Sequence, residues 1–462
     1  SHSAYRFVEF AAAAGFSVWQ MLPVGPTHED HSPYLSLSAN AGNPLLISLD
    51  WLKDRGWLDS YHAQQSPEQG DAHRRECLQQ AFQGFRHSAD GVWRARFQAF
   101  IDARADWLAD YALFAALREV YGGQHWVDWP TALRDRQPVA IEAARSEHAG
   151  RIEQHCFEQF VFSTQWAELR AFAHGHGVQL FGDLPLFVAH NSADVWASRE
   201  LFAVSPGGQP ELIAGVPPDY FAQDGQIWGN PLYRWQAHQA QGFEWWLRRL
   251  RTQLALFDLV RVDHFRGLES HWELPAGARS AREGRWVPSP GAQLLARLQS
   301  QLHPLPLVAE DLGVITAEVD ALRQQHGLPG MRVLQFGFDG SPHNVHLPQN
   351  FTEMTVAYTG THDNATTVEW QQSLDAHTRE ALRFHFPNHD QPMPWPVIHA
   401  ALASVARLAM VPMQDLLELG PGNRMNTPGT VTGNWSWRYT WKQVPETLAQ
   451  HLRQLNQRYG RA

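Results

Sequence analysis

The stretch L-F-D-L-V-R-V-D-H-F-R-G at residues 256–267 predicts a buried strand that ends in a carboxylate, Asp263. The same pattern recurs twice further along the chain, and the intervals leave room for a helix and its loops between successive strands. The recurrences are P-L-V-A-E-D-L-G at 306–313, which contains Glu310, and T-V-A-Y-T-G-T-H-D-N at 355–364, which contains Asp363. Catalytic groups of (β/α)₈ barrels come from the C-terminal ends of several strands, so the pattern predicts an α/β barrel with a carboxylate site.

Two carboxyl groups suffice for retaining glycoside chemistry, in which one acts as nucleophile and the other as acid and then base. In a retaining site the two carboxyl groups lie about 5–5.5 Å apart. Acids at strand ends also cap helices or pair with arginine, and for one such acid in isolation that structural interpretation is favoured.

Composition narrows the function classes. The 462 residues carry a net charge of −10, which argues against nucleic-acid and anionic-membrane binding, and no apolar run is long enough to span a bilayer. Cys77 and Cys156 are too few for a disulfide framework, which suggests a reducing cytoplasm. The 20 Trp, 24 Phe and 10 Tyr favour a carbohydrate ligand, although most such rings pack in cores.

Strand-like and helix-like runs alternate along the chain, as in a parallel α/β fold. We expect one catalytic barrel over 1–462, with an inserted helical subdomain at 52–160 and a loop-rich one at 190–240 at the active-site face. The predicted strands are the three carboxylate-bearing runs and 17–22, 177–183, 331–336 and 408–413. These are seven strands where a closed barrel needs eight. Strands 17–22 and 408–413 would then flank a gap, and we expect the natural chain to continue upstream of Ser1 with the missing strand.

The chain resembles 4-α-glucanotransferases of the amylomaltase or disproportionating-enzyme type, glycoside hydrolase family 77. R-V-D-H-F-R-G (261–267), A-E-D-L-G (309–313) and G-T-H-D-N (360–364) in this order are highly specific for that family. Further matching stretches are W-Q-M-L-P-V-G-P-T (19–27), S-P-Y (32–34), G-D-L-P-L-F-V (182–188), G-Q-I-W-G-N-P-L-Y (225–233) and P-G-T-V-T-G-N-W-S-W-R (428–438). They run from end to end of the chain.

The resemblance implies a retaining transfer of α-1,4-glucan segments from a maltooligosaccharide, starch or glycogen chain to glucose or another glucan. Asp263 would be the nucleophile, Glu310 the acid and base, and Asp363 a stabiliser of the transition state. The Asp263 and Glu310 carboxyl groups would then lie about 5–5.5 Å apart. Three strand-end acids in this order within these motifs favour catalysis over capping or salt bridges. The negative charge of Asp263 would raise the pKa of Glu310. The chemistry requires no metal or cofactor. The alternatives are an α-glucan hydrolase of the same clan and a glucan-binding barrel without catalysis.

The resemblance also implies substrate-binding side chains around the carboxylates. Arg261 lies two residues before Asp263, so on a strand both face the same side, which suits either positioning of the nucleophile or a plain salt bridge. Asp183 would bind sugar or support Arg261, and Tyr34 would stack on sugar or pack in the core. The remaining predicted contacts are His362 at the donor sugar, Gln226 and Trp228 in a covering loop at 217–231 with Asp219, Tyr220 and Phe221, and Asn434 in a cleft wall at 429–437.

One segment departs from the family pattern. The family commonly has a Gly- and Tyr-containing turn followed by S-P-Y-Q, whereas this chain has H-E-D-H at 28–31 and Leu35 in place of the Gln. This segment therefore carries no signal for a remote glucan-binding groove built on that Tyr.

Overall fold

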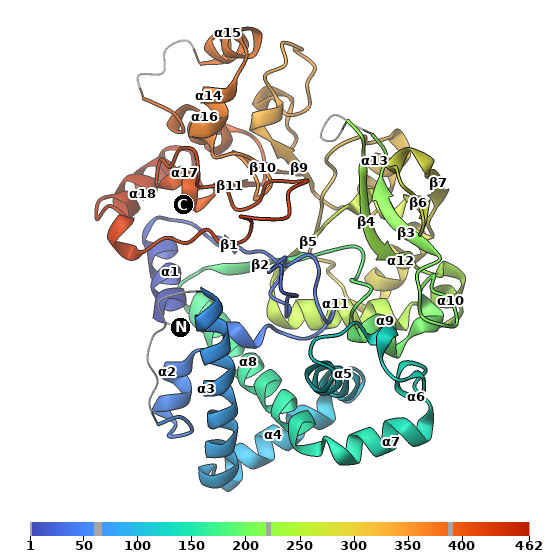
Figure 1. Cartoon of the computed structure of the whole chain (residues 1–462). Helices are drawn as coiled ribbons and strands as arrows, with labels where there is room; N and C mark the ends of the chain where they lie inside the picture. Colours follow the sequence, from blue (N-terminus) through green and yellow to red (C-terminus); the bar gives the residue numbers. More distant parts are fainter. Residues whose placement is uncertain (1, 60–66, 219–222, 387–390, 462) are drawn as a thin grey trace.

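A computed structural model describes residues 2–59, 67–218, 223–386 and 391–461. All seven predicted strands are present, and they form one parallel sheet in the order β1-β2-β5-β8-β9-β10-β11 (Figure 1). The fold is a nearly closed parallel barrel with helices around it, as expected for a (β/α)₈-type architecture. The strands are β1 Val18–Gln20, β2 Gln179–Leu184, β5 Leu259–Val262, β8 Leu307–Ala309, β9 Gly330–Val333, β10 Thr355–Tyr358 and β11 Leu408–Met410.

Strand β2 illustrates why these segments become barrel strands. All of its residues except the first are buried, because a parallel strand is covered on both faces. Gly182 leaves room for the ring of Phe257, with which any Cβ at this position would clash. The parallel register pairs Asp183 with Arg261 on β5, so the fold places these two residues side by side.

Helices follow most of the strands and complete the α/β alternation. Within the described residues the helices associated with the barrel are α1 His2–Ala13, α8 Ala149–Gly175, α11 Glu244–Leu256, α12 Gly291–Gln301, α13 Ala317–Gln325, α14 Thr367–Ser373, α15 Ala376–His385, α16 Trp395–Ala403, α17 Met413–Leu416 and α18 Leu448–Arg458. The last of these helices, α18, contacts α1 and α16.

A helical unit separates β1 from β2 and lies below the barrel in Figure 1. Its core is aromatic: the ring of Phe85 lies 4.9 Å from Trp57 and 5.0 Å from Phe157 of α8. Many of the rings that suggested a sugar ligand are therefore structural, as the sequence interpretation allowed. The helices of this unit are α2 Leu49–Asp54, α3 Pro67–Ser88, α4 Gly91–Ala103, α5 Leu108–Val120, α6 Thr131–Arg134 and α7 Pro138–Glu147.

A second sheet, which the sequence did not predict, lies beside the barrel (Figure 1). It is antiparallel in the order β4-β3-β6-β7. Two of its strands, with the short helices α9 Ala193–Ala197 and α10 Trp235–Ala240, occupy the segment expected to be rich in loops. The other two lie between β5 and β8, where we expected a helix and loops alone. The strands are β3 Leu212–Val216, β4 Gln226–Pro231, β6 Ser270–Pro275 and β7 Arg285–Pro288.

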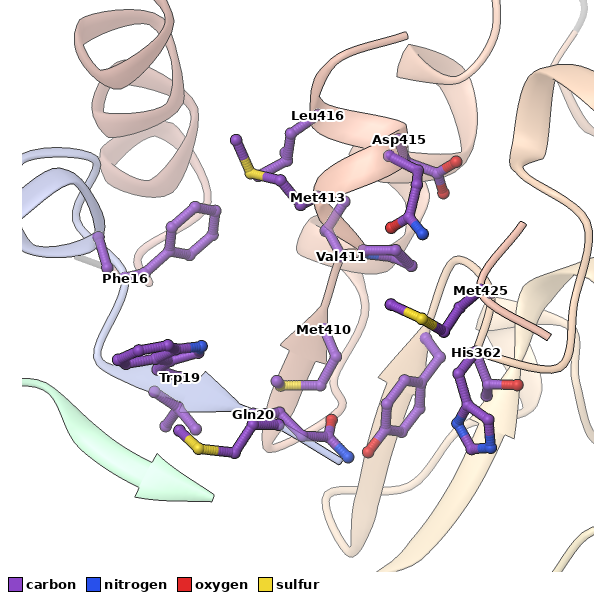
Figure 2. Close-up of a pocket in the computed structure, with 18 of the residues that line it drawn as sticks. Phe16, Trp19, Gln20, His362, Met410, Val411, Met413, Asp415, Leu416 and Met425 are labelled. Carbon is purple, nitrogen blue, oxygen red and sulfur yellow. The ribbon is translucent and has the colours of Figure 1, made fainter. Parts of the chain in front are cut away.

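The barrel sheet has β1 and β11 at its two ends, so the expectation that these strands flank a gap is confirmed. A cavity of about 650 Å³ is lined by both strands and reaches the side chains of Asp183 and Arg261. Trp19, Met410 and Met413 contribute to its apolar wall (Figure 2). Among the described residues, no helix has the length and apolar character needed to cross a membrane.

Candidate active site

The three predicted carboxylates lie beyond the C-terminal ends of barrel strands. Asp263 follows β5 and Glu310 follows the adjacent strand β8. The Asp263 amide donates to the Leu184 carbonyl at 2.9 Å and the Glu310 amide to the Val262 carbonyl at 3.0 Å, so the ladder of hydrogen bonds holds both backbones. Asp363 lies in the loop after β10, which is two strands beyond β8. The fold thus brings the three acids to one rim of the barrel.

Arg261 joins two carboxylates. Its guanidinium lies 2.8 Å and 2.7 Å from the two oxygens of Asp183 and 2.8 Å from Oδ1 of Asp263. Burial alone would lower the pKa of Arg261, but Asp183 and Asp263 raise it well above its ordinary value, so the guanidinium stays charged. Of the two roles considered for Asp183, support of Arg261 is the contact observed. The ion pair with Arg261 holds the Asp263 carboxylate in position at the end of β5.

Glu310 has the opposite electrostatic setting. Burial and, to a lesser extent, the charge of Asp263 raise its pKa to about 7, whereas Arg261 and two backbone amides oppose the shift. Those amides belong to His264, 2.7 Å from Oε2, and Leu312, 2.9 Å from Oε1. The sequence interpretation named Asp263 as the cause, but burial contributes more. A carboxyl group whose pKa is raised by burial in this way is suited to act as the acid.

Aromatic rings line the side of the site next to Asp363. Tyr34 donates its hydroxyl hydrogen to Oδ2 of Asp183 at 2.7 Å, and its ring stacks on His362 with centroids 5.1 Å apart. Trp435 lies 5.8 Å from Tyr34 and 5.9 Å from His362. The three rings come from motifs far apart in the sequence, at 32–34, 360–364 and 428–438, and the fold brings them together. A flat aromatic wall beside a carboxylate suits the apolar face of a sugar ring.

The segment 423–435 holds the loop of Asp363 from outside. Asn426 donates from Nδ2 to Oδ1 of Asp363 at 2.7 Å, and Arg424 donates to the Asp363 carbonyl at 2.8 Å. Asn434 uses its side chain within its own turn, accepting from the Thr427 amide at 2.9 Å and donating to the Thr430 carbonyl at 3.0 Å. Asn434 therefore shapes the turn that presents Trp435. The sequence interpretation missed Arg424 and Asn426, which lie outside every motif it used.

The opposite wall is carried by β4 rather than by a loop. Gln226 and Trp228 lie on this strand, and Trp228 donates from Nε1 to Oε1 of Gln226 at 3.0 Å. The Trp228 ring meets the His264 ring edge-on at 4.8 Å, and Phe187 lies 6.4 Å from Trp228. Since the His264 amide binds Glu310, this wall is continuous with the predicted acid. Asp219, Tyr220 and Phe221, which we predicted to cover the site, lie outside the described residues.

Comparison with known proteins identifies the family. The family model described as 4-alpha-glucanotransferase matches residues 1–443. A 4-alpha-glucanotransferase of Thermus thermophilus is 46% identical over 94% of this chain and 89% of its own length. One of Synechocystis sp. is 44% identical over 99% and 93% of the two chains. The structure of an amylomaltase from Streptococcus agalactiae in complex with acarbose matches with a TM-score of 0.96 and 33% identity, over 100% of this chain and 95% of that one.

These matches run almost the full length of each relative. The chain belongs to glycoside hydrolase family 77, the family of the 4-alpha-glucanotransferases. It is an enzyme of this type, and the expected fold and activity class are confirmed.

The ion pairs of Arg261 give a first testable prediction. Replacing Arg261 with Leu leaves the buried Asp183 carboxylate without its cation, and we expect the free energy of unfolding to fall by about 3–5 kcal/mol. Urea unfolding followed by circular dichroism measures the loss. Arg261→Lys keeps the charge but not the fork that reaches both carboxylates, so we expect a smaller loss. An unchanged unfolding midpoint in Arg261→Leu would contradict this role.

Proposed function

We propose that this chain transfers α-1,4-glucan segments from a maltooligosaccharide or a longer glucan to the 4-hydroxyl of glucose or another glucan, with retention. The observation that carries the proposal is the pairing of Asp263, held by charged Arg261, with Glu310, whose pKa lies near 7, on the adjacent strand. The names of the relatives support the same donor class.

In the first half of the reaction, an ionised oxygen of Asp263 attacks the anomeric carbon of the donor. The bond from that carbon to the glycosidic oxygen breaks, and Glu310 gives its proton to the departing oxygen. In the second half, Glu310 takes the proton of the acceptor hydroxyl, and the acceptor oxygen displaces Asp263. Two inversions at one carbon retain its configuration. A pKa near 7 suits a group that both gives and takes a proton at neutral pH.

Binding of the donor sugar falls to the aromatic side of the site. Asp363 and His362 would bind sugar hydroxyls and stabilise the oxocarbenium-like transition state. Tyr34 would contact the same sugar with its ring, since its hydroxyl is already engaged by Asp183.

The proposed location is the cytoplasm. The two buried free thiols, Cys77 and Cys156, agree with the reducing conditions of that compartment.

Product analysis after incubation with maltotriose tests the proposal. Transfer yields maltooligosaccharides longer than the substrate together with glucose and shorter sugars, and chromatography separates them. Hydrolysis, the main alternative, yields glucose and maltose without longer products. Recovery of unchanged maltotriose would reject the proposal and would favour the other alternative, a glucan-binding barrel without catalysis.

Trp228 gives a second prediction, on the ratio of transfer to hydrolysis. A sugar acceptor needs contacts to bind, whereas water needs only access, so removing part of the acceptor wall favours water. We expect Trp228→Ala to raise free glucose relative to longer oligomers about 3- to 10-fold, which corresponds to one lost apolar contact of about 1 kcal/mol. Trp286→Ala, a ring change on β7, serves as the control. An unaltered product ratio in Trp228→Ala would count against the acceptor role.

A further inference from the structure

The loop that carries His362 and Asp363 is tied at both of its ends. It leaves the barrel after β10 through Thr359 and enters α14 at Thr367, and both threonines are completely buried. The contacts from Asn426 and Arg424 reach it from outside, where the Asp363 side chain is 47% exposed and water competes for the same groups. Within the loop, Asn364 also accepts from the Thr361 amide at 2.9 Å, and the two buried ends fix where the loop starts and finishes.

One carboxylate binds both ends. Asp415 on α17 is 1% exposed. Its Oδ2 accepts from the hydroxyls of Thr359 and Thr367 at 2.7 Å each, and its Oδ1 accepts from the Thr367 amide at 2.8 Å. Residues before and after the loop are thus joined through a single side chain from the next βα unit of the barrel.

The hydrogen bonds of Asp415 indicate a structural role. Both of its oxygens are engaged by the threonines, so little accepting capacity remains for a ligand. Figure 2 shows Asp415 on the same side of the cavity as His362, on a different element. Burial raises the pKa of Asp415, and the donors from Thr367 and Thr359 oppose that shift. A buried polar cluster of this kind is rigid because each group needs its partner.

We propose that Asp415 is a positioning residue for the transfer reaction, which fixes the 360–366 loop so that His362 and Asp363 face the donor sugar. The inference rests on the function proposed above for Asp363. Contacts that strengthen in the transition state act on kcat more than on KM. A displacement of about 1 Å of a catalytic group can lower the rate about 100-fold.

The test compares Asp415→Ala with Asp415→Asn in the full chain, with maltotriose as substrate. We expect Asp415→Ala to lower kcat about 10- to 100-fold with less than a threefold change in KM, because its carboxylate no longer joins the loop ends. Asp415→Asn keeps one carbonyl oxygen for the Thr367 amide, and the threonine hydroxyls can rotate to accept from its amide group. It should therefore restore kcat to within about threefold of the wild type.

Asp258→Ala is the matched control. Asp258 accepts from the Leu180 amide at 2.8 Å and pairs with Arg170, but it precedes β5, at the end of the barrel away from the site. A similar loss of thermal stability with an unchanged kcat in this control shows that instability alone does not lower turnover. If Asp415→Ala does not fold, Thr359→Val removes one donor with little change in shape and should lower kcat about 3- to 10-fold, the effect of about 1 kcal/mol.

Three outcomes separate the inference from the proposed function. If Asp415→Ala folds and has the kcat of the wild type, the positioning role is overturned. If Asp415→Ala does not fold, a wild-type kcat in Thr359→Val overturns it. Equal losses of kcat in Asp415→Ala, Asp415→Asn and Asp258→Ala overturn it as well. Wild-type turnover of Asp363→Asn instead rejects the role proposed for Asp363 itself, whatever Asp415 does.

Discussion

Asp263→Asn is expected to lower kcat for transfer from maltotriose by on the order of 10⁴-fold, the scale seen when a covalent nucleophile is removed. An amide cannot supply the negative oxygen that attacks the anomeric carbon, and binding contacts alone leave only a small residual rate. Chromatography measures product formation with maltotriose as the sole substrate, and circular dichroism confirms that the variant is folded.

A control for this variant removes a carboxylate of similar chemistry far from the site. Glu244→Gln on α11 alters an exposed pair with Arg297, and the Glu244 side chain is 58% exposed. We expect its activity to match the wild type. Transfer by Asp263→Asn at a rate near that of Glu244→Gln would reject the nucleophile assignment.

Glu310→Gln should lower kcat/KM about 10²- to 10⁴-fold, the usual contribution of a general acid and base. Since the acid form is needed and the pKa of Glu310 is about 7, wild-type kcat/KM should decline as pH rises through about 7. That decline should disappear from the residual activity of Glu310→Gln. If kcat/KM of Glu310→Gln declined with pH as it does in the wild type, a group other than Glu310 would cause the decline.

The same pKa predicts an effect on stability. The folded-state pKa of Glu310 lies above the ordinary value of 4.5, so the stability that the protonated group contributes is complete below about pH 4.5 and is lost as pH rises through about 7. Gln has no such ionisation. We therefore expect Glu310→Gln to raise Tm at pH 8 and to raise it less at pH 5, measured by differential scanning fluorimetry.

The sequence predicted the barrel because its strands are short apolar runs, three of which end in a carboxylate. Burial on both faces leaves a parallel strand little freedom in composition, so 177–183 and 355–358 were recognisable without partners. The antiparallel strands β4 and β6 were missed because each has a partly exposed face and their segments contain Pro, Gly and Trp. Their pairing is set by tertiary contacts rather than by a local pattern.

The positions of the candidate site residues were predictable to a similar extent. Residues at strand ends, such as Asp263 and Glu310, could be placed because the barrel fixes where strands end. Asn426 and Asp415 could not, because their contacts join segments with no period or spacing in common. Asn434 shows the converse: its motif was noticed, but its side chain serves its own turn.

The position of Arg261 has a consequence for the electrical balance of the proposed cycle. When the sugar becomes attached to Asp263, that oxygen loses its negative charge, and Glu310 acquires one by releasing its proton. Both carboxyls lie within the field of Arg261. The total charge around this guanidinium is therefore the same before and after the sugar is attached. The proposed cycle therefore adds no net charge at this end of the barrel, and no ion has to accompany a neutral glucan into or out of the site.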